Sequence, residues 1–163
     1  MEQKTKINAA EGKRDLTITR EFDLPVELLF KAYSEAELLE QWMGTKVIKL
    51  ESKKHGSYQF ETSHQGKIVF RANGTIHEFM PDQKIIRTFE MENSPIGVQL
   101  EFLEFEKITE TVSKLSIHII YRSVEHRSEQ LKMRFAFGLN MAHNQLQEIF
   151  NRNKYISTAS KWR

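Results

Sequence analysis

Between Gly44 and Tyr121 the chain is a succession of short segments in which apolar and polar residues alternate. Such a period of two is typical of β-strands that bury one face. Turn sequences, among them His55-Gly56, Gln65-Gly66 and Met80-Pro81-Asp82, separate the segments. Because turns of about two to five residues join neighbouring antiparallel strands, this stretch predicts an antiparallel meander. The residues that characterise its six strands are Val47, Ile48 and Leu50; Tyr58, Phe60, Thr62 and His64; Ile68, Phe70, Ala72, Gly74 and Ile76; Ile85, Ile86, Phe89 and Met91; Val98, Leu100 and Phe102; and Leu115, Ile117, Ile119 and Tyr121.

One long helix is predicted after the meander, from Ser128 to about Asn153. Apolar residues recur there at helical steps of about three and four residues. They are Leu131, Phe135, Leu139, Ala142, Leu146, Ile149 and Phe150. A second apolar line lies on another flank and consists of Met133, Phe137 and Met141. A helix with so wide an apolar surface can cover the sheet, close a cavity or meet a second subunit.

The segment before the meander predicts a strand and two short helices. The strand runs from Leu16 to Phe22, where apolar and polar residues again alternate. Pro25 ends it, because proline lacks the N–H that a sheet needs but suits the first turn of a helix. We expect Ser34 to cap the second helix, with Glu37 completing a capping box.

We expect a single domain. Residues 1–13 are polar and without periodicity, so they are predicted to be a flexible lead-in to a domain of residues 14–153, followed by a C-terminal tail, 154–163. A chain of 163 residues can bury roughly 70% of the surface that it exposes when unfolded. There are no internal repeats and no low-complexity linkers.

The composition argues against several classes of partner. The net charge is +2, and the 24 basic residues are interleaved with acidic ones, so we expect no nucleic-acid binding. No apolar run approaches the length of about 18 residues that a membrane span needs. The chain has no cysteine and begins with no secretory signal, so we expect a cytoplasmic location.

One strand of the meander changes the side on which its apolar residues lie. Val98, Leu100 and Phe102 share one parity, whereas Leu103 and Phe105 hold the other. A slip of one residue reverses the two faces of a strand, so a bulge is predicted near Phe102. In the alternative, Leu103 and Phe105 lie on an outer face that meets a second copy of the protein.

The order of these elements, and several motifs within them, resembles the helix-grip fold of the START-like superfamily. The branch that it most resembles is the one related to the activator of the ninety-kilodalton heat-shock chaperone's ATPase. The resemblance spans about residues 14–151 and rests on Ile18-Thr19-Arg20-Glu21-Phe22, Pro25, Leu29-Phe30-Lys31-Ala32-Tyr33, Glu37-Leu38-Leu39-Glu40-Gln41-Trp42-Met43-Gly44, Gly56-Ser57-Tyr58-Gln59-Phe60, Gly74-Thr75-Ile76 with Pro81, and Gly138-Leu139 with Leu146 and Ile149. It implies an α+β fold in which a curved antiparallel sheet of about seven strands wraps around the long C-terminal helix.

The chain departs from the branch's usual pattern at positions that face its pocket. Gly56-Ser57 stands where a double glycine is frequent, Met43 replaces a second tryptophan, Leu139 replaces an aromatic residue and His143 replaces a leucine. These differences leave the identity of the ligand open.

The resemblance implies three kinds of function. Members of the superfamily bind lipids, sterols, polyketides or other hydrophobic molecules between helix and sheet, and a few are cyclases or hydrolases. We therefore expect non-catalytic binding of a small hydrophobic ligand. The alternatives are a docking module, as a homodimer or with a chaperone partner, and an enzyme of the cyclase or hydrolase kind that uses a buried His or Glu. Fold alone does not choose among them.

The 11 phenylalanines suggest an apolar cavity lined by aromatic rings, or a bulky core. The wall is predicted to comprise Trp42, Tyr58, Phe60, Phe70, Phe89, Phe102, Phe135 and Leu139, although each of these could equally be ordinary core.

Three polar residues share the apolar faces. His64 continues the apolar side of its strand, His143 lies within the apolar stripe of the last helix, and Glu104 continues the side of Phe102 unless the bulge turns it outward. His143 is our candidate anchor for the polar end of the ligand, and His64 is a second candidate in the wall.

Six histidines, at positions 55, 64, 77, 118, 126 and 143, could suggest a metal site. No two of them lie four residues apart on a predicted helix, and none belongs to a known metal motif. We therefore expect neither a metal nor another cofactor.

Overall fold

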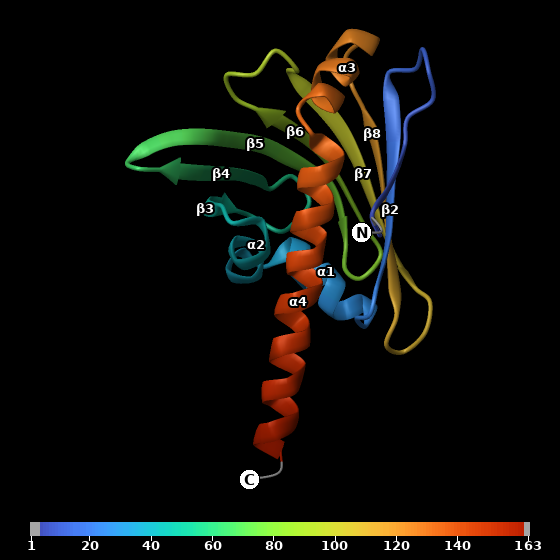
Figure 1. Ribbon diagram of the computed structural model, residues 1–163, viewed down its shortest axis with the longest axis vertical. Helices are drawn as coiled ribbons and strands as arrows, with labels where there is room; N and C mark the ends of the chain where they lie inside the picture. Colours follow the sequence, from blue (N-terminus) through green and yellow to red (C-terminus); the bar gives the residue numbers. More distant parts are fainter. Residues whose placement is uncertain (1–3, 162–163) are drawn as a thin grey trace.

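A computed structural model describes residues 4–161, and the side chains of residues 4–152. Eight antiparallel strands form one curved sheet that wraps around a long C-terminal helix (Figure 1). The strands are β1 (Lys6–Asn8), β2 (Asp15–Phe22), β3 (Lys46–Leu50), β4 (Ser57–His64), β5 (Lys67–Met80), β6 (Lys84–Met91), β7 (Val98–Lys107) and β8 (Ser113–Ile120). The helices are α1 (Val26–Ser34), α2 (Ala36–Met43), α3 (Val124–Lys132) and α4 (Phe135–Lys161).

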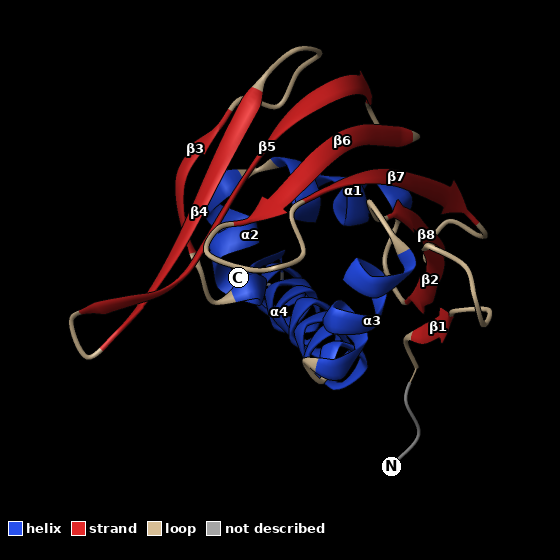
Figure 2. Ribbon diagram, turned by 90° about the horizontal axis from the view of Figure 1, so that it is seen from above, coloured by secondary structure: helices blue, strands red, loops and turns tan. Residues whose placement is uncertain are grey.

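The order of strands across the sheet is β1-β2-β8-β7-β6-β5-β4-β3. The six strands from β3 to β8 are the predicted meander, and β2 extends the open sheet by pairing with β8. Figure 2 looks along α4 and shows the sheet curving around it. The predicted helix-grip fold is therefore confirmed. None of the helices within residues 4–161 is long and apolar enough to cross a membrane.

The sequence pattern did not predict β1. This strand lies inside the segment expected to be a flexible lead-in. It pairs with β2, so that Ile7 lies opposite Ile18. Thr5 beside it is buried. At the other end, α4 continues to Lys161, beyond the predicted end of the last helix. Residues 1–3 and 162–163 of the two predicted tails lie outside the described residues.

The predicted cap of the second short helix is wrong. Ser34 is the last residue of α1, and Glu35 occupies the N-cap position of α2 without a side-chain hydrogen bond. The carbonyl of Ser34 instead accepts a hydrogen bond from the Ser52 hydroxyl at 2.5 Å. Because the N-cap is Glu35, the N3 position falls on Leu38 and not on Glu37, so no capping box forms.

The single long helix predicted from Ser128 is two helices. The first begins at Val124, where the Ser123 side chain accepts a hydrogen bond from the His126 N–H at 3.1 Å. The chain then breaks at Arg134, whose φ of 55° is left-handed and cannot continue a right-handed helix. One consequence is that Leu131, predicted to be in the apolar stripe, is 36% exposed.

The bulge predicted near Phe102 is absent, because β7 pairs with both neighbours in unbroken register. Its inner face carries Gln99, Glu101, Leu103 and Phe105, all of them buried. The alternative, in which Leu103 and Phe105 face outward, is therefore wrong as well. The inner face of β7 thus carries two polar residues, Gln99 and Glu101. Hydrophobic patterning would assign both residues to the solvent-facing side.

The core lies between the inner face of the sheet and the helices α1 and α4. Leu29 of α1, Leu115 of β8 and Leu146 of α4 are fully buried within it. Phe30 packs edge-to-face on Phe105 with ring centroids 4.9 Å apart. Such contacts hold the helices against one half of the sheet and leave the other half free for a cavity.

Gly74 offers a test of this packing. A Cβ at this position would collide with the carbonyl oxygen of Thr88 and the hydroxyl of Tyr58, which are hydrogen-bonded to each other at 2.6 Å. We expect Gly74→Ala to lower the free energy of unfolding by about 2 kcal/mol. The control is Gly138→Ala in α4, where a Cβ meets nothing within 4 Å, and which should raise stability by about 0.5–1 kcal/mol. Urea denaturation of both variants checks the pair, and equal effects would contradict the close approach at Gly74.

Candidate functional site

A cavity of about 410 Å³ lies between the inner face of the sheet, α2 and the start of α4. Most of its wall is apolar and includes Ile18, Leu39, Met43, Met91, Ile117 and Ile119. The volume is within the range of about 300–1,000 Å³ that is typical of small-molecule sites. The cavity forms because the curved sheet stands away from α4 on this side while the core fills the other.

Five of the predicted wall residues meet at this cavity. They are Trp42 of α2, Phe70 of β5, Phe89 of β6, and Phe135 and Leu139 of α4. Trp42 is 6% exposed, and its indole N–H donates to the carbonyl oxygen of Ala32 at 2.7 Å. The ring is therefore held by a backbone hydrogen bond, and its apolar surface is left for the cavity.

The other five predicted residues lie elsewhere. Tyr58 and Phe60 are buried in the core of β4, with their rings 5.0 Å apart, and do not line the cavity. His64 is exposed at the end of β4. Phe102 lies on the outer face of β7, stacked on His118 at 5.9 Å. His143 is fully buried behind the cavity wall.

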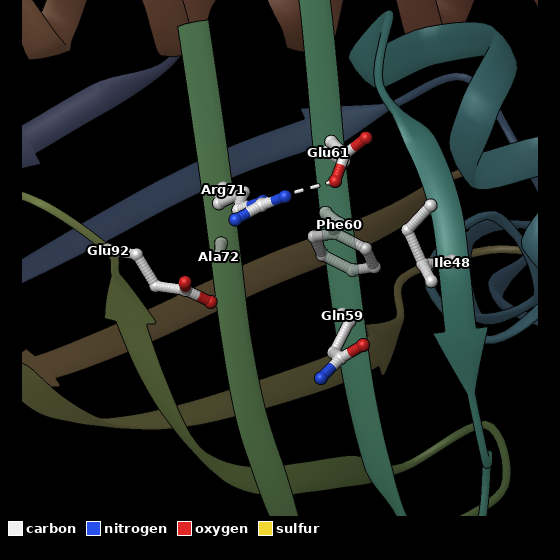
Figure 3. Close-up of a pocket in the computed structure, with 7 residues that line it drawn as sticks. All are labelled: Ile48, Gln59, Phe60, Glu61, Arg71, Ala72 and Glu92. Atoms are coloured by element: carbon white, nitrogen blue, oxygen red, sulfur yellow. Dashed lines mark hydrogen bonds and ion pairs between the residues drawn. The ribbon is translucent and has the colours of Figure 1, made fainter. Parts of the chain in front are cut away.

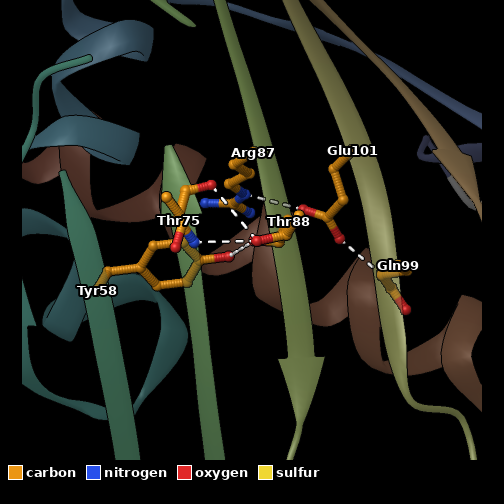
Figure 4. A network of polar contacts seen from close by, with 6 residues as sticks. All are labelled: Tyr58, Thr75, Arg87, Thr88, Gln99 and Glu101. Carbon is orange, nitrogen blue, oxygen red and sulfur yellow. Dashed lines mark hydrogen bonds and ion pairs between the residues drawn. The ribbon is translucent and has the colours of Figure 1, made fainter. Parts of the chain in front are cut away.

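A polar cluster interrupts the apolar wall (Figure 4). The guanidinium of Arg87 donates from Nε to Oε1 of Glu101 at 2.9 Å, and the side-chain amide of Gln99 donates to Oε2 at 2.7 Å. The same guanidinium lies over the ring of Tyr58, 5.3 Å from its centre. Burial alone would lower the pKa of Arg87, but the acidic groups of Tyr58 and Glu101 raise it above its ordinary value. The arginine is therefore a permanent cation in the wall.

Neither Arg87, Gln99 nor Glu101 was predicted to belong to the site. A usable signal lies in β6, where Ile85, Arg87 and Phe89 share one parity, so that a charged residue interrupts an apolar face. For β7 the hydrophobic pattern was misleading. Gln99 and Glu101 face the cavity, but because they are polar the pattern assigns them to the solvent-facing side.

Behind the wall, His143 belongs to a second buried cluster that joins α4 to Thr5, the residue before β1. Its Nδ1 lies 2.8 Å from the hydroxyl of Thr5, and its Nε2 lies 3.2 Å from the hydroxyl of Tyr33, a residue that lines the cavity. Arg20 donates to the same Thr5 hydroxyl at 3.1 Å. Burial, reinforced by the positive charge of Arg20, lowers the pKa of His143 to about 3. The imidazole is therefore neutral in the folded protein.

The mouth of the cavity lies at the break between α3 and α4. Met133 and Arg134 line it and are exposed to solvent. Met133, Phe137 and Met141, the predicted second apolar line, are 46%, 49% and 53% exposed. We call these three residues the apolar flank. An apolar surface thus borders the entrance.

Two smaller depressions lie on the outer face of the sheet. The first, of about 180 Å³, is crossed by an ion pair between Arg71 and Glu61, with Nε and Oε2 3.1 Å apart (Figure 3). The second is bordered by Phe102, His118 and Glu104. Glu104, a candidate for a buried acid, is exposed there. Both depressions are smaller than the inner cavity, and fewer side chains line them.

The curved sheet, the C-terminal helix and the cavity between them define a START-like protein of the helix-grip type. The sequence matches the family model described as Activator of Hsp90 ATPase homolog 1-like protein over residues 23–151, most of the chain. The chain therefore belongs to this family. No curated protein matches the sequence.

Solved structures of bacterial proteins share the fold. One from Rhodobacter sphaeroides is 19% identical, with a TM-score of 0.79 over 90% of this chain and 99% of its own. One from Mycobacterium smegmatis is 20% identical, with a TM-score of 0.78 over 89% of this chain and 95% of its own. A third, from Arthrobacter aurescens, is 15% identical, with a TM-score of 0.79 over 90% and 91%. At these identities the likeness concerns the fold alone.

The chemistry of the cavity suits binding. Its polar groups can donate and accept hydrogen bonds, and both oxygens of its one carboxylate, Glu101, are already engaged. Within the described side chains, no three His, Asp or Glu residues converge as ligands of a metal would. A fold of this family is consistent with a ligand-binding or cofactor-type module.

Proposed function

We propose that the protein binds a small hydrophobic molecule in the inner cavity and catalyses no reaction on it. The observation that carries this proposal is a largely apolar cavity of about 410 Å³ whose wall contains the hydrogen-bonded cluster of Arg87, Gln99 and Glu101, with Gln130 and Arg134 as further polar residues at the break between α3 and α4. Apolar burial contributes about 25 cal/mol per Å² and drives binding, while a few polar groups orient the ligand. The neutral, buried state of His143 and the engaged oxygens of Glu101 support binding over acid–base catalysis.

Native mass spectrometry of the purified protein, followed by denaturing release, tests the proposal on any ligand that the protein carries. A bound molecule of defined mass, predominantly apolar, is the expected result. A second candidate function is docking of another protein, which the exposed apolar flank beside the cavity mouth favours. A ligand-free protein that forms a clean dimer would support docking and count against the cavity.

Filling the cavity should weaken binding. Ala142 of α4 lines the cavity, whereas its neighbour Met141 is 53% exposed. We expect Ala142→Phe to weaken binding of the apolar probe N-phenyl-1-naphthylamine by at least about tenfold, since the added ring occupies the ligand's volume. Fluorescence titration measures this affinity. Met141→Phe, the matched control, should leave it unchanged, and equal losses in both variants would show that the probe binds outside the cavity.

A further inference from the structure

The polar cluster of the cavity is more specific than an apolar pocket requires. Arg87 of β6 and Glu101 of β7 are direct cross-strand partners, and their side chains are only 14% and 7% exposed. Burying two charges is costly unless they are paired and hydrogen-bonded, and here they are. Apolar residues at both positions would fold as well or better, so the pair is better explained by what it offers to the cavity.

What the cluster offers is mainly hydrogen-bond donors. Arg87 uses Nε for Glu101, and neither of its two terminal nitrogens makes a hydrogen bond within the described residues. They are not among the buried polar atoms that lack a partner, so they are accessible from the cavity that Arg87 lines. Figure 4 shows the guanidinium held between Tyr58 and Glu101. An orientation fixed on both sides presents these donors to an acceptor without a further loss of side-chain entropy.

The charge balance decides which acceptor suits them. The carboxylate of Glu101 already neutralises Arg87 at 2.9 Å. A ligand carboxylate would add a second negative charge beside Glu101 against a largely apolar wall, and no other cation among the described residues lines the buried part of that wall. Arg134 is at the exposed mouth. An uncharged carbonyl oxygen accepts the same hydrogen bonds and adds no charge.

We propose that Arg87, held and neutralised by Glu101, selects neutral hydrophobic molecules with a carbonyl acceptor, such as ketones or esters, and disfavours carboxylates. This inference rests on the ligand-binding function proposed above and names the class of its ligand. Glu101 is the residue that determines the selection, because removing its charge would leave Arg87 an unbalanced cation that attracts a carboxylate.

Displacement of N-phenyl-1-naphthylamine, which carries no carbonyl acceptor, tests the inference. The two competitors are undecan-2-one and undecanoate, measured at about pH 8, where the acid is ionised. Any apolar cavity favours the ketone over the carboxylate. The test is therefore how substitutions at the polar cluster change the ratio of the two affinities. In Glu101→Gln, undecanoate should gain at least about tenfold in affinity relative to the ketone. The matched control is Glu104→Gln, which removes a charge from the exposed outer face of the same strand and should change neither competitor.

A second variant makes the result independent of how well Glu101→Gln folds. Replacing both partners, Arg87→Met with Glu101→Leu, leaves no unpaired charge. This double variant should bind the probe within about threefold of the wild type but the ketone about tenfold more weakly, because a hydrogen bond from a charged donor is lost. Unchanged ketone affinity there, or an unchanged preference in Glu101→Gln, overturns the inference and leaves hydrophobic binding intact. If the probe does not bind the wild-type protein at all, the proposed function fails as well.

Discussion

Acidification from pH 6.5 to pH 4.5 is expected to remove about 2–3 kcal/mol from the free energy of unfolding, through His143 alone. The imidazole is fully buried, and its pKa in the folded protein falls from the ordinary 6.5 to about 3. Between these two values the unfolded chain binds a proton that the folded protein does not. Stability from this group is therefore complete above pH 6.5 and is lost as the pH falls toward 3.

The pH range in which His143 lowers stability can be separated from the range in which carboxylates do so. Hydrogen bonds lower the pKa of Asp15, Glu51 and Glu110 below ordinary values, so these groups lose their contribution only at still lower pH. Urea denaturation at several pH values above 4.5 should give a slope near 1.4 kcal/mol per pH unit for the wild type. His143→Gln should flatten this slope.

His64→Gln is the matched control for this prediction. His64 is exposed at the end of β4, so replacing it should leave the slope as it is in the wild type. A wild-type slope near zero between pH 4.5 and 6.5 would show that His143 takes up a proton as readily in the folded protein as in the unfolded chain. A slope that His64→Gln removes would show that it does not come from His143, and either result contradicts the prediction. His143→Gln also bears on the ligand. Since His143 lies behind the cavity wall, we expect this substitution to change ligand affinity only through Tyr33, whose hydroxyl is next to the imidazole.

Much of the fold could be predicted because its strands repeat a simple pattern. Alternation along β2, β4, β5, β6 and β8 reports burial of one face, and short turns leave antiparallel pairing as the only arrangement. The predictions failed where the sequence carries no local signal. Arg134 carries no sequence mark of a left-handed residue, and the three residues of β1 are too few to show a period.

The site was predicted less well, for a reason that β7 makes clear. Val98, Leu100 and Phe102 are the more apolar set, yet they lie on the outer face, and Gln99 and Glu101 face the cavity. Hydrophobic patterning assumes that the inner face is apolar, which fails where a cavity needs polar groups. Aromatic residues gave the position of the cavity. Its polar groups could be found only once β6 and β7 were paired and Arg87 met Glu101.

Separating Arg87 from Glu101 should have the largest effect of any single change at the site. Arg87→Met leaves the carboxylate of Glu101, 7% exposed, without its cation, and we expect a loss of about 3–5 kcal/mol in the free energy of unfolding. In Arg87→Met with Glu101→Leu, no charge remains to be buried, and only the side-chain amide of Gln99 loses its acceptor, so stability should return to within about 2 kcal/mol of the wild type. A double-mutant cycle in urea measures the coupling between the two residues.

The control is a second arginine–glutamate ion pair, which lies on the outer face of the sheet. Arg71 donates from Nε to Glu61 at 3.1 Å, but these side chains are 48% and 26% exposed, and water can solvate either charge alone. Arg71→Met should therefore cost less than about 1 kcal/mol. If Arg87→Met costs no more than Arg71→Met, Glu101 must reach water through the cavity mouth. In that case the charge balance at the wall is too weak to select between a ketone and a carboxylate, so this stability measurement also bears on the proposed ligand class.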